Sequence, residues 1–186
     1  NIKCITTTHY IIVEQVDNYF RSHRNKFKSQ VVSLRYFNVY GPREKHKGSM
    51  ASIVYQLHCQ LKQGNTIKLF EGSGGYESGE QRRDFIYIDD VIKANIFFMQ
   101  NPKISGVFNI GTGRSQTFNE VATAIINWHG QGEIEYIPFP PGLKDRYQSY
   151  TQSDLSLLRQ AGYVETFFSI EEGVNAYLDK IETKIE

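Results

Sequence analysis

Apolar residues follow two patterns along the chain. Short apolar runs predict strands at residues 31–37, 67–70, 85–88, 107–110 and 134–137. Apolar residues spaced three or four apart predict helices at residues 10–23, 49–63, 89–100, 117–128, 153–160 and 169–180. Strands separated by helices favour parallel crossover connections, so the pattern predicts an α/β protein with a parallel sheet.

Polar residues mark the expected helix starts. Ser49 stands where an N-cap belongs before the helix of residues 49–63. Asp89 or Asp90 is expected to cap the next helix, and Thr117 or Asn119 the one after it.

Two loops follow expected strands, at the sheet edge where open parallel sheets bind ligands. Residues 38–42 follow the strand 31–37, and Gly111–Gly113 follows the strand 107–110. The second loop has two glycines of a dinucleotide fingerprint, but Gln116 stands where the third glycine belongs. We interpret it as a strand-to-helix turn and expect no dinucleotide site in the chain itself.

Composition places the 186-residue chain among globular proteins, since 40% of residues are hydrophobic and 22% charged. A net charge of +1 gives no bulk attraction to nucleic acid or an anionic membrane, so we expect neither as a partner. No apolar run approaches the roughly 20 residues of a membrane span. Cys4 and Cys59 lack metal-site spacing, which predicts free thiols and a cytoplasmic location. A start at Asn1, without a signal-peptide pattern, predicts a fragment or a truncated product.

Three polar groups are candidates for ligand binding. Asn38 leaves an apolar strand and can present an amide to a cleft; alternatively it holds its own loop. Lys47 precedes an expected helix start, where it can bind an anion or act as an acid or base; alternatively it is a solvated lysine. Arg83, beside a glycine-rich loop, suits a diphosphate; alternatively it forms a salt bridge with Asp84 or Asp89.

Residues 35–43, 83–91 and 108–113 together resemble the extended short-chain dehydrogenases/reductases that act on sugar nucleotides. The more selective segments, residues 46–52, 68–73, 134–140 and 146–155, are similar to the ADP-heptose 6-epimerase branch of that family. The resemblance runs from about Val31 to the end of the chain.

The resemblance implies a role for each matching residue. Lys47 would act as an acid/base group at the epimerised carbon and would contact the cofactor, with Val39 against the nicotinamide. Arg83 would hold the diphosphate, and Tyr147 would close the pocket. The residues implied at the substrate are Asn38, Ser49, Gln56, Phe70, Glu71, Gly72, Ser73, Arg83 and Tyr147, with Gln56 standing where the family has a histidine.

The implied reaction converts ADP-D-glycero-D-manno-heptose to its L-glycero epimer, a precursor of the lipopolysaccharide core. Bound NADP would remove a hydride at heptose C6 and return it to the other face; the sequence leaves NAD and NADP open. The implied assembly is a homo-oligomer.

The implied fold is the carboxyl-terminal part of a Rossmann-type parallel sheet plus a small α/β substrate-binding domain. Residues 1–45 would be a remnant of the dinucleotide-binding domain. Residues 46–186 would form mainly the substrate-binding domain, with residues 83–115 returning to the Rossmann-type sheet.

The sequence departs from the family pattern near its start. Ile5 and His9 occupy the positions of the catalytic Tyr-x-x-x-Lys pair, and Tyr10 cannot replace it because Glu14 stands four residues later. The loop of residues 74–80 is also longer than usual. Three alternatives follow: the substrate half of a heptose epimerase, a catalytically silent sugar-nucleotide-binding module, or another extended epimerase or dehydratase.

Overall fold

The computed structural model describes residue 15 and residues 17–183. Ile5, His9, Tyr10 and Glu14, on which the comparison with the Tyr-x-x-x-Lys pair depends, lie outside the described residues, as does Cys4. Residues 17–23 are helical, which confirms that part of the helix expected at residues 10–23.

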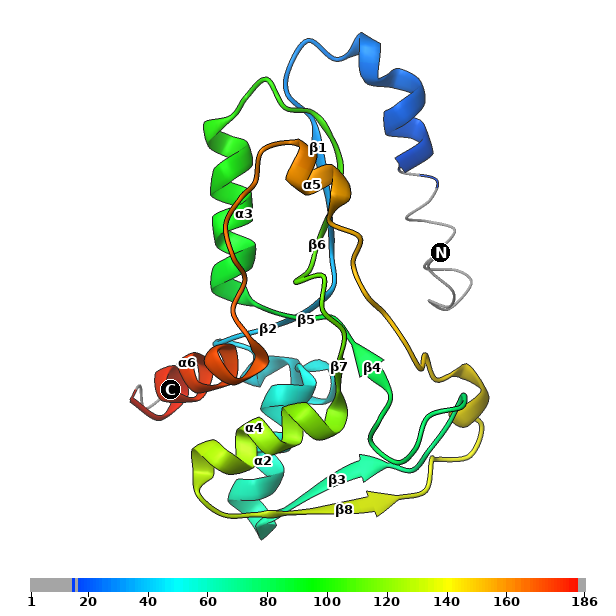
Figure 1. Ribbon diagram of the computed structural model, residues 1–186, viewed down its shortest axis with the longest axis vertical. Helices are drawn as coiled ribbons and strands as arrows, with labels where there is room; N and C mark the ends of the chain where they lie inside the picture. Colours follow the sequence, from blue (N-terminus) through cyan, green and yellow to red (C-terminus); the bar gives the residue numbers. More distant parts are fainter. Residues whose placement is uncertain (1–14, 16, 184–186) are drawn as a thin grey trace.

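Strands and helices alternate along most of the chain (Figure 1). The strands are β1 (Val32–Tyr36), β2 (Asn38–Tyr40), β3 (Thr66–Phe70), β4 (Arg82–Arg83), β5 (Phe85–Tyr87), β6 (Gly106–Ile110), β7 (Gln116–Thr117) and β8 (Glu133–Ile137). The helices are α2 (Ile53–Gly64), α3 (Ile88–Gln100), α4 (Phe118–His129), α5 (Ser156–Gln160) and α6 (Ile170–Thr183), with 3-10 turns η1 (Arg24–Lys26), η2 (Lys45–Met50) and η3 (Lys144–Arg146). The predicted α/β class is confirmed.

Parallel pairing joins strands that are far apart in sequence. β1 pairs with β6, β2 with β5, and β3 with β8, all parallel, whereas the short β4 and β7 pair antiparallel. Tyr36 lies opposite Ile110, and the Phe37 N–H donates to the Ile110 carbonyl at 3.0 Å. The loop expected at residues 38–42 was wrong in part, because its first three residues form β2. The segments that follow β1 and β6 start side by side.

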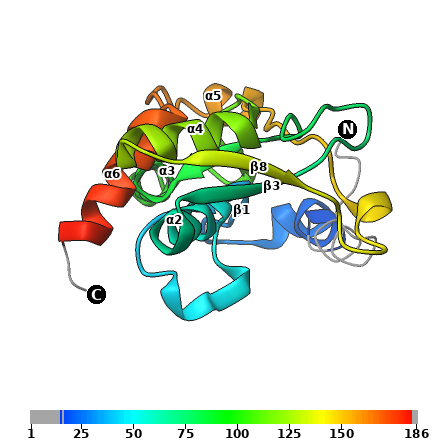
Figure 2. The ribbon, with the colours of Figure 1, turned by 90° about the horizontal axis from the view of Figure 1, so that it is seen from below.

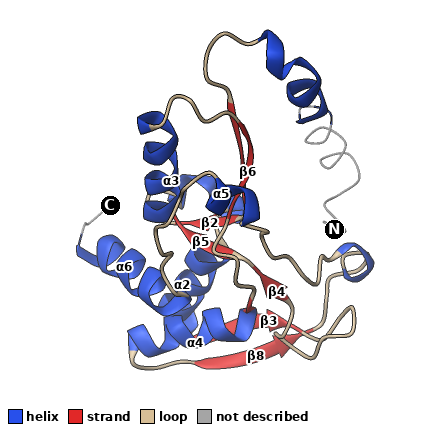
Figure 3. Ribbon diagram, turned by 45° about the horizontal axis from the view of Figure 1, so that its top comes forward, coloured by secondary structure: helices blue, strands red, loops and turns tan. Residues whose placement is uncertain are grey.

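Strand β5 separates two apolar cores. Phe85 and Tyr87 belong to the larger core, which is built largely from α2, α4 and α6, while Ile86 belongs to the core beneath α3 and α5. Alternation of side chains along a strand places these neighbours on opposite faces. Figure 3 shows the β2–β5 pair between the β1–β6 pair and the helices α2, α4 and α6. Seen from below, α2 and α4 flank the β3–β8 pair (Figure 2).

Helix starts differ in part from the predicted ones. Ser52, not Ser49, caps α2, and its Oγ accepts from the Tyr55 N–H at 3.3 Å. Thr117 caps α4 as predicted, in a reciprocal capping box with Glu120. Helix α3 starts after Tyr87 without a side-chain cap, so the predicted caps at its start were wrong; Asp89 and Asp90 lie in its first turn.

Helix α5 starts at Ser156, so the predicted start at Ser153 was wrong. Among the described residues, no helix is long and apolar enough to span a bilayer.

A buried histidine pair joins α2 to α4. His58 is 2% exposed, and its Nδ1 lies 3.0 Å from the Nε2 of His129. Burial lowers the pKa of His58 to about 4, with the neighbouring His129 lowering it further and the Glu182 carboxylate opposing the shift. Burial also lowers the pKa of His129. Both rings are therefore neutral at pH 7.

We expect this pair to make the folded chain sensitive to acid. The unfolded chain takes up the His58 proton near the ordinary pKa of 6.5, well above the folded value of about 4. The contribution to stability is therefore complete above pH 6.5 and is lost as the pH falls toward 4, by about 2 to 3 kcal/mol. Urea unfolding at pH 7.5 and pH 4.5 measures it.

The matched variants are His58→Gln and His46→Gln, since His46 is exposed. The His58→Gln variant should lose most of the pH dependence, and the His46→Gln variant should keep it. Equal pH dependence in both variants would rule out the buried pair as its source.

Candidate functional site

Arg83 is a buried cation that has no anionic partner among the described residues. Its residue is 8% exposed, and its Nη1 donates to the Arg82 carbonyl at 3.0 Å. No carboxylate among the described residues lies within salt-bridge distance of the guanidinium, so the alternative of a salt bridge to Asp84 or Asp89 was wrong. Burial lowers the pKa of Arg83, but a guanidinium stays charged at neutral pH. An uncompensated buried charge of this kind favours an anionic ligand.

An aromatic cluster lies beside this guanidinium. We use this name for Phe70, Phe139 and Tyr147: the two phenylalanine rings stack at 4.5 Å, and Tyr147 contacts both edge-on. The Arg83 guanidinium lies 5.3 Å from the Tyr147 ring centre and 5.8 Å from that of Phe118. Burial raises the pKa of Tyr147, so it stays a neutral phenol. Flat apolar surface next to a cation suits a ligand that joins a ring to a phosphate.

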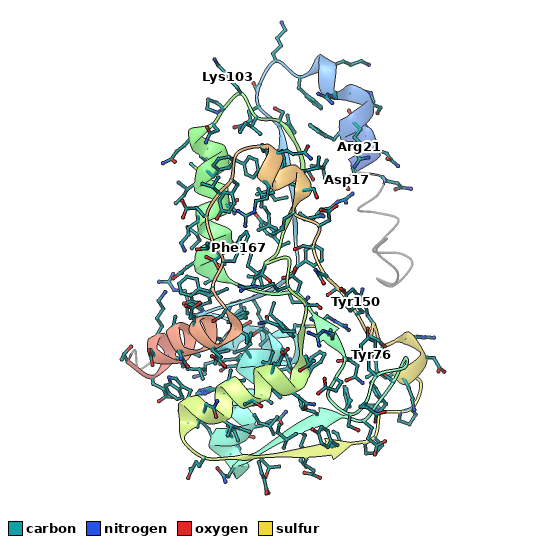
Figure 4. The ribbon with its side chains drawn as sticks, in the orientation of Figure 1. Asp17, Arg21, Tyr76, Lys103, Tyr150 and Phe167 are labelled. Carbon is teal, nitrogen blue, oxygen red and sulfur yellow. The ribbon has the colours of Figure 1, made fainter. Side chains whose placement is uncertain are left out.

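The glycine-rich loop of residues 72–79 packs against the segment that carries Tyr147. Gly74 has φ +60°, and a Cβ there would collide with the Ser149 Oγ. Ser73 and Tyr76 form an antiparallel bridge, and the Gly79 N–H donates to the Phe70 carbonyl at 3.1 Å. Figure 4 shows Tyr76 and Tyr150, from these two segments, in the same corner of the molecule. The loop and residues 147–150 thus lie next to each other.

Asp84, the residue after Arg83, connects β4 and β5 to neighbouring segments through hydrogen bonds. It is 0% exposed, and its Oδ1 accepts from the N–H and Oγ1 of Thr112. Its Oδ2 accepts from the Gly113 N–H and from the N–H and Oγ of Ser153. A Cβ at Gly111 would collide with Ser153 and Asp84, which explains the glycine there. These five hydrogen bonds fix the junction of β4 and β5 to the turn after β6.

Asn38 lies beside this junction. Its N–H donates to the Asp84 carbonyl at 3.0 Å, and its Nδ2 donates to the same carbonyl at 3.1 Å and to the Thr151 Oγ1 at 3.5 Å. The amide nitrogen thus holds the strand ends together, as one of the two sequence interpretations expected.

The structure therefore gathers most of the predicted substrate residues around β4. The members joined by these contacts are Asn38, Phe70, Glu71, Gly72, Ser73, Arg83 and Tyr147.

Sequence comparison shows the family to which the chain belongs. The model of the "NAD dependent epimerase/dehydratase family" matches residues 7–111, more than half of the chain. The chain belongs to this family. An ADP-L-glycero-D-manno-heptose-6-epimerase from Alkalilimnicola ehrlichii is 54% identical over 165 residues, which are 89% of this chain and 52% of that protein.

Solved structures of epimerases share the fold. The Helicobacter pylori ADP-L-glycero-D-manno-heptose-6-epimerase is 34% identical, with a TM-score of 0.76 over 90% of this chain and 49% of that chain. The Thermotoga maritima UDP-glucose 4-epimerase with UDP-glucose is 28% identical, with a TM-score of 0.73 over 93% of this chain and 52% of that chain. The chain thus spans about half the length of these relatives, and the matches confirm the Rossmann-like α/β fold.

The family is described as NAD dependent. The turn after β6 is the glycine-containing turn between a strand and a helix that could bind the pyrophosphate of such a cofactor. The N–H groups of Thr112 and Gly113 both donate to Asp84, so they are not available to a phosphate. This turn therefore does not fit a dinucleotide pyrophosphate. Val39, expected against the nicotinamide, is half-buried and packs against the core beneath α3 and α5.

The segment of Lys47 lies outside the group of residues around β4. Residues 45–50 are exposed, and no hydrogen bond, ion pair or ring contact among the described residues joins Lys47 to Arg83. Glu44 holds one end of this segment by accepting from the Ser52 N–H and Oγ. Gln56 holds the other end, since its Nε2 donates to the Ser49 and Ala51 carbonyls. The roles of Lys47, Ser49 and Gln56 at a ligand stay predictions.

The sequence indicated no role in the site for three of its residues. Asp84 was expected only as a salt-bridge partner of Arg83, and nothing in the residues around it indicates a buried carboxylate. Phe139 lies in the segment 134–140, which carries the resemblance but implied no role for this ring, and Gln81 lies in a polar loop. Among the described residues, no group of three or more His, Cys, Asp or Glu side chains is arranged to hold a metal ion.

Proposed function

We propose that this chain is the substrate-binding part of a sugar-nucleotide epimerase that acts on ADP-D-glycero-D-manno-heptose at C6 with NADP as its cofactor. The observation that carries the proposal is the buried Arg83 guanidinium, which has no carboxylate partner among the described residues and lies beside the aromatic cluster. A guanidinium binds diphosphate oxygens through parallel hydrogen bonds, and aromatic rings accept a flat ligand surface.

Each predicted residue has a place in this proposal. The diphosphate would lie on Arg83, with Phe70–Ser73 and Tyr147 on the side of the aromatic cluster and Asn38 toward the sugar. Ser49 and Gln56 would line the sugar side, and Lys47 would exchange a proton with the reacting carbon next to Val39. A bound dinucleotide would supply the hydride chemistry, and its pyrophosphate would have to lie elsewhere than at the turn after β6, whose N–H groups donate to Asp84.

The proposed domain division follows the strand pairing. Residues 1–45 would belong to a dinucleotide-binding domain and residues 46–186 mainly to a substrate-binding domain, with residues 83–115 returning to the first. The pairing of β1 with β6 supports that return. A homo-oligomer and a place in lipopolysaccharide core synthesis are part of the same proposal; the names of the heptose-epimerase relatives support the substrate and the reaction only.

Calorimetric titration with two nucleotide sugars tests the proposal. ADP-heptose is expected to bind at least tenfold more tightly than UDP-glucose, a difference of about 1.4 kcal/mol. Tighter binding of UDP-glucose would instead favour a nucleotide-sugar 4-epimerase, and binding of neither sugar would contradict the proposed site.

A turnover assay with ADP-heptose and NADP separates binding from catalysis. We expect the chain by itself to bind the sugar without converting it, because the isoleucine at position 5 cannot transfer a proton. Any epimerisation by the chain alone would contradict this expectation and would show that another group supplies the base.

A further inference from the structure

Gln81 joins two parts of the candidate site. Its residue is 1% exposed, and its Nε2 donates to the Glu71 carbonyl at 2.8 Å and to the Ser73 Oγ at 3.1 Å. The backbone carbonyl of Gln81 accepts from the Phe118 N–H at 3.3 Å. It directly precedes β4, whose second residue is Arg83. One buried amide thus links Phe70–Ser73 to the strand that carries the guanidinium.

We propose that Gln81 is a positioning residue for nucleotide-sugar binding. It acts through Phe70–Ser73, which its amide holds at a fixed place relative to Arg83. This inference rests on the proposed function, because that function assigns Phe70–Ser73 to the ligand. Gln81 is too buried to touch a ligand itself.

The backbone around Phe70–Ser73 explains why the hydrogen bonds from Gln81 are needed to hold this segment. The loop that follows contains Gly74 at φ +60° and Gly75 at φ +85°, and glycines leave a chain segment many accessible conformations. Without the Gln81 donor, the Glu71 carbonyl and the Ser73 hydroxyl lose a partner within the protein. Phe70–Ser73 would then move away from the position set by its contacts with Gln81.

Arg83 does not depend on Gln81 in the same way. Its guanidinium is held by the Arg82 carbonyl and by the rings of Tyr147 and Phe118. Loss of the Gln81 amide should therefore disturb contacts with the base and sugar parts of a ligand, but not contacts with its phosphates. A residue with only a structural role would affect both parts equally.

The test uses the full chain with a Gln81→Met substitution, which keeps the side-chain length and removes the donor. Calorimetry with ADP and with inorganic pyrophosphate should show an ADP Kd raised about tenfold, the loss expected for buried hydrogen bonds. The pyrophosphate Kd of the variant should stay within about twofold of that of the unmodified chain, a much smaller change than the tenfold change in the ADP Kd.

A matched control is Gln30→Met. The Gln30 Nε2 likewise donates to backbone carbonyls, that of Phe98 in the last turn of α3 and those of Asn101 and Ile104 in the loop after it. This variant should lower the melting temperature and leave both Kd values unchanged.

A second variant, Gln81→Glu, keeps the shape of the side chain. A carboxylate cannot donate but a protonated carboxyl can, and burial raises the pKa of such a carboxyl. Its ADP affinity relative to that of the unmodified chain should therefore recover in part as the pH is lowered from about 9 to about 5. This rescue would not be expected from a change in packing, and it remains measurable if the methionine variant does not fold.

Equal losses of ADP and pyrophosphate affinity in the Gln81 variants, or an unchanged ADP Kd, would overturn the positioning role. If the unmodified chain binds neither ADP nor pyrophosphate, the proposed function itself fails, and the role of Gln81 fails with it. The two failures are distinguished by the titrations of the unmodified chain.

Discussion

The Asp84→Asn variant is expected to lose about 3 to 5 kcal/mol of unfolding free energy, the range for disrupting a buried charged network. Every hydrogen bond to the Asp84 carboxylate is donated by a neighbour. The donors are the N–H and hydroxyl groups of Thr112 and Ser153 and the N–H of Gly113. An amide places an NH₂ group against some of these donors, so hydrogen bonds are lost and like dipoles meet. Urea unfolding measures the loss.

Asp89→Asn is the matched control, since Asp89 pairs with Lys180 at an exposed position. An exposed pair contributes at most about 1 kcal/mol, so this variant should remain close to the unmodified chain. A loss below about 1 kcal/mol in Asp84→Asn would show that the junction does not depend on the carboxylate.

The Arg83→Met variant is expected to bind ADP about 100-fold more weakly, because it removes the charge-assisted hydrogen bonds to the diphosphate, worth about 2.7 kcal/mol. Arg83→Lys keeps the charge but not the paired donors, and should lose about tenfold. Without ligand, the methionine variant should be at least as stable as the unmodified chain, because the buried charge is no longer desolvated. Calorimetry and thermal melts measure the two effects.

The matched control is Arg82→Met, because Arg82 is half-buried and donates to the Oγ and the carbonyl of Ser115. It should change ADP affinity by less than about threefold, below the loss of a single good hydrogen bond. Equal weakening by the Arg82 and Arg83 substitutions would show that the phosphates are not held specifically by Arg83.

The sequence predicted the longer strands because apolar residues recur in each of them, but it did not say which strands pair. The parallel direction of β1 and β6 agrees with the crossover rule, whereas their pairing and register come from the structure and place the ends of both strands at one edge. Strands β2, β4 and β7 have only two or three residues, too few for a period of two to be recognised, whereas the apolar run of β5 was predicted.

The contacts that define the site could not be predicted from local pattern. Asp84 is satisfied by partners 28 to 69 residues away in sequence, so nothing near it indicates a buried carboxylate. The hydrogen bonds of Gln81 likewise depend on the path of the loop of residues 72–79, which brings Gln81 next to Glu71. The N-cap of α2 was predicted at the wrong serine because Ser49 and Ser52 both suit that position. Hydrogen bonds from Ser52 to the Glu44 carboxylate favour Ser52.

A structure of the chain bound to ADP-heptose would show which groups hold each part of the ligand. We expect the diphosphate within hydrogen-bond distance of the Arg83 guanidinium, a ring of the ligand against Phe70, Phe139 or Tyr147, and Asn38 and Lys47 facing the heptose. A diphosphate bound elsewhere, or a heptose that neither Asn38 nor Lys47 faces, would contradict this expectation.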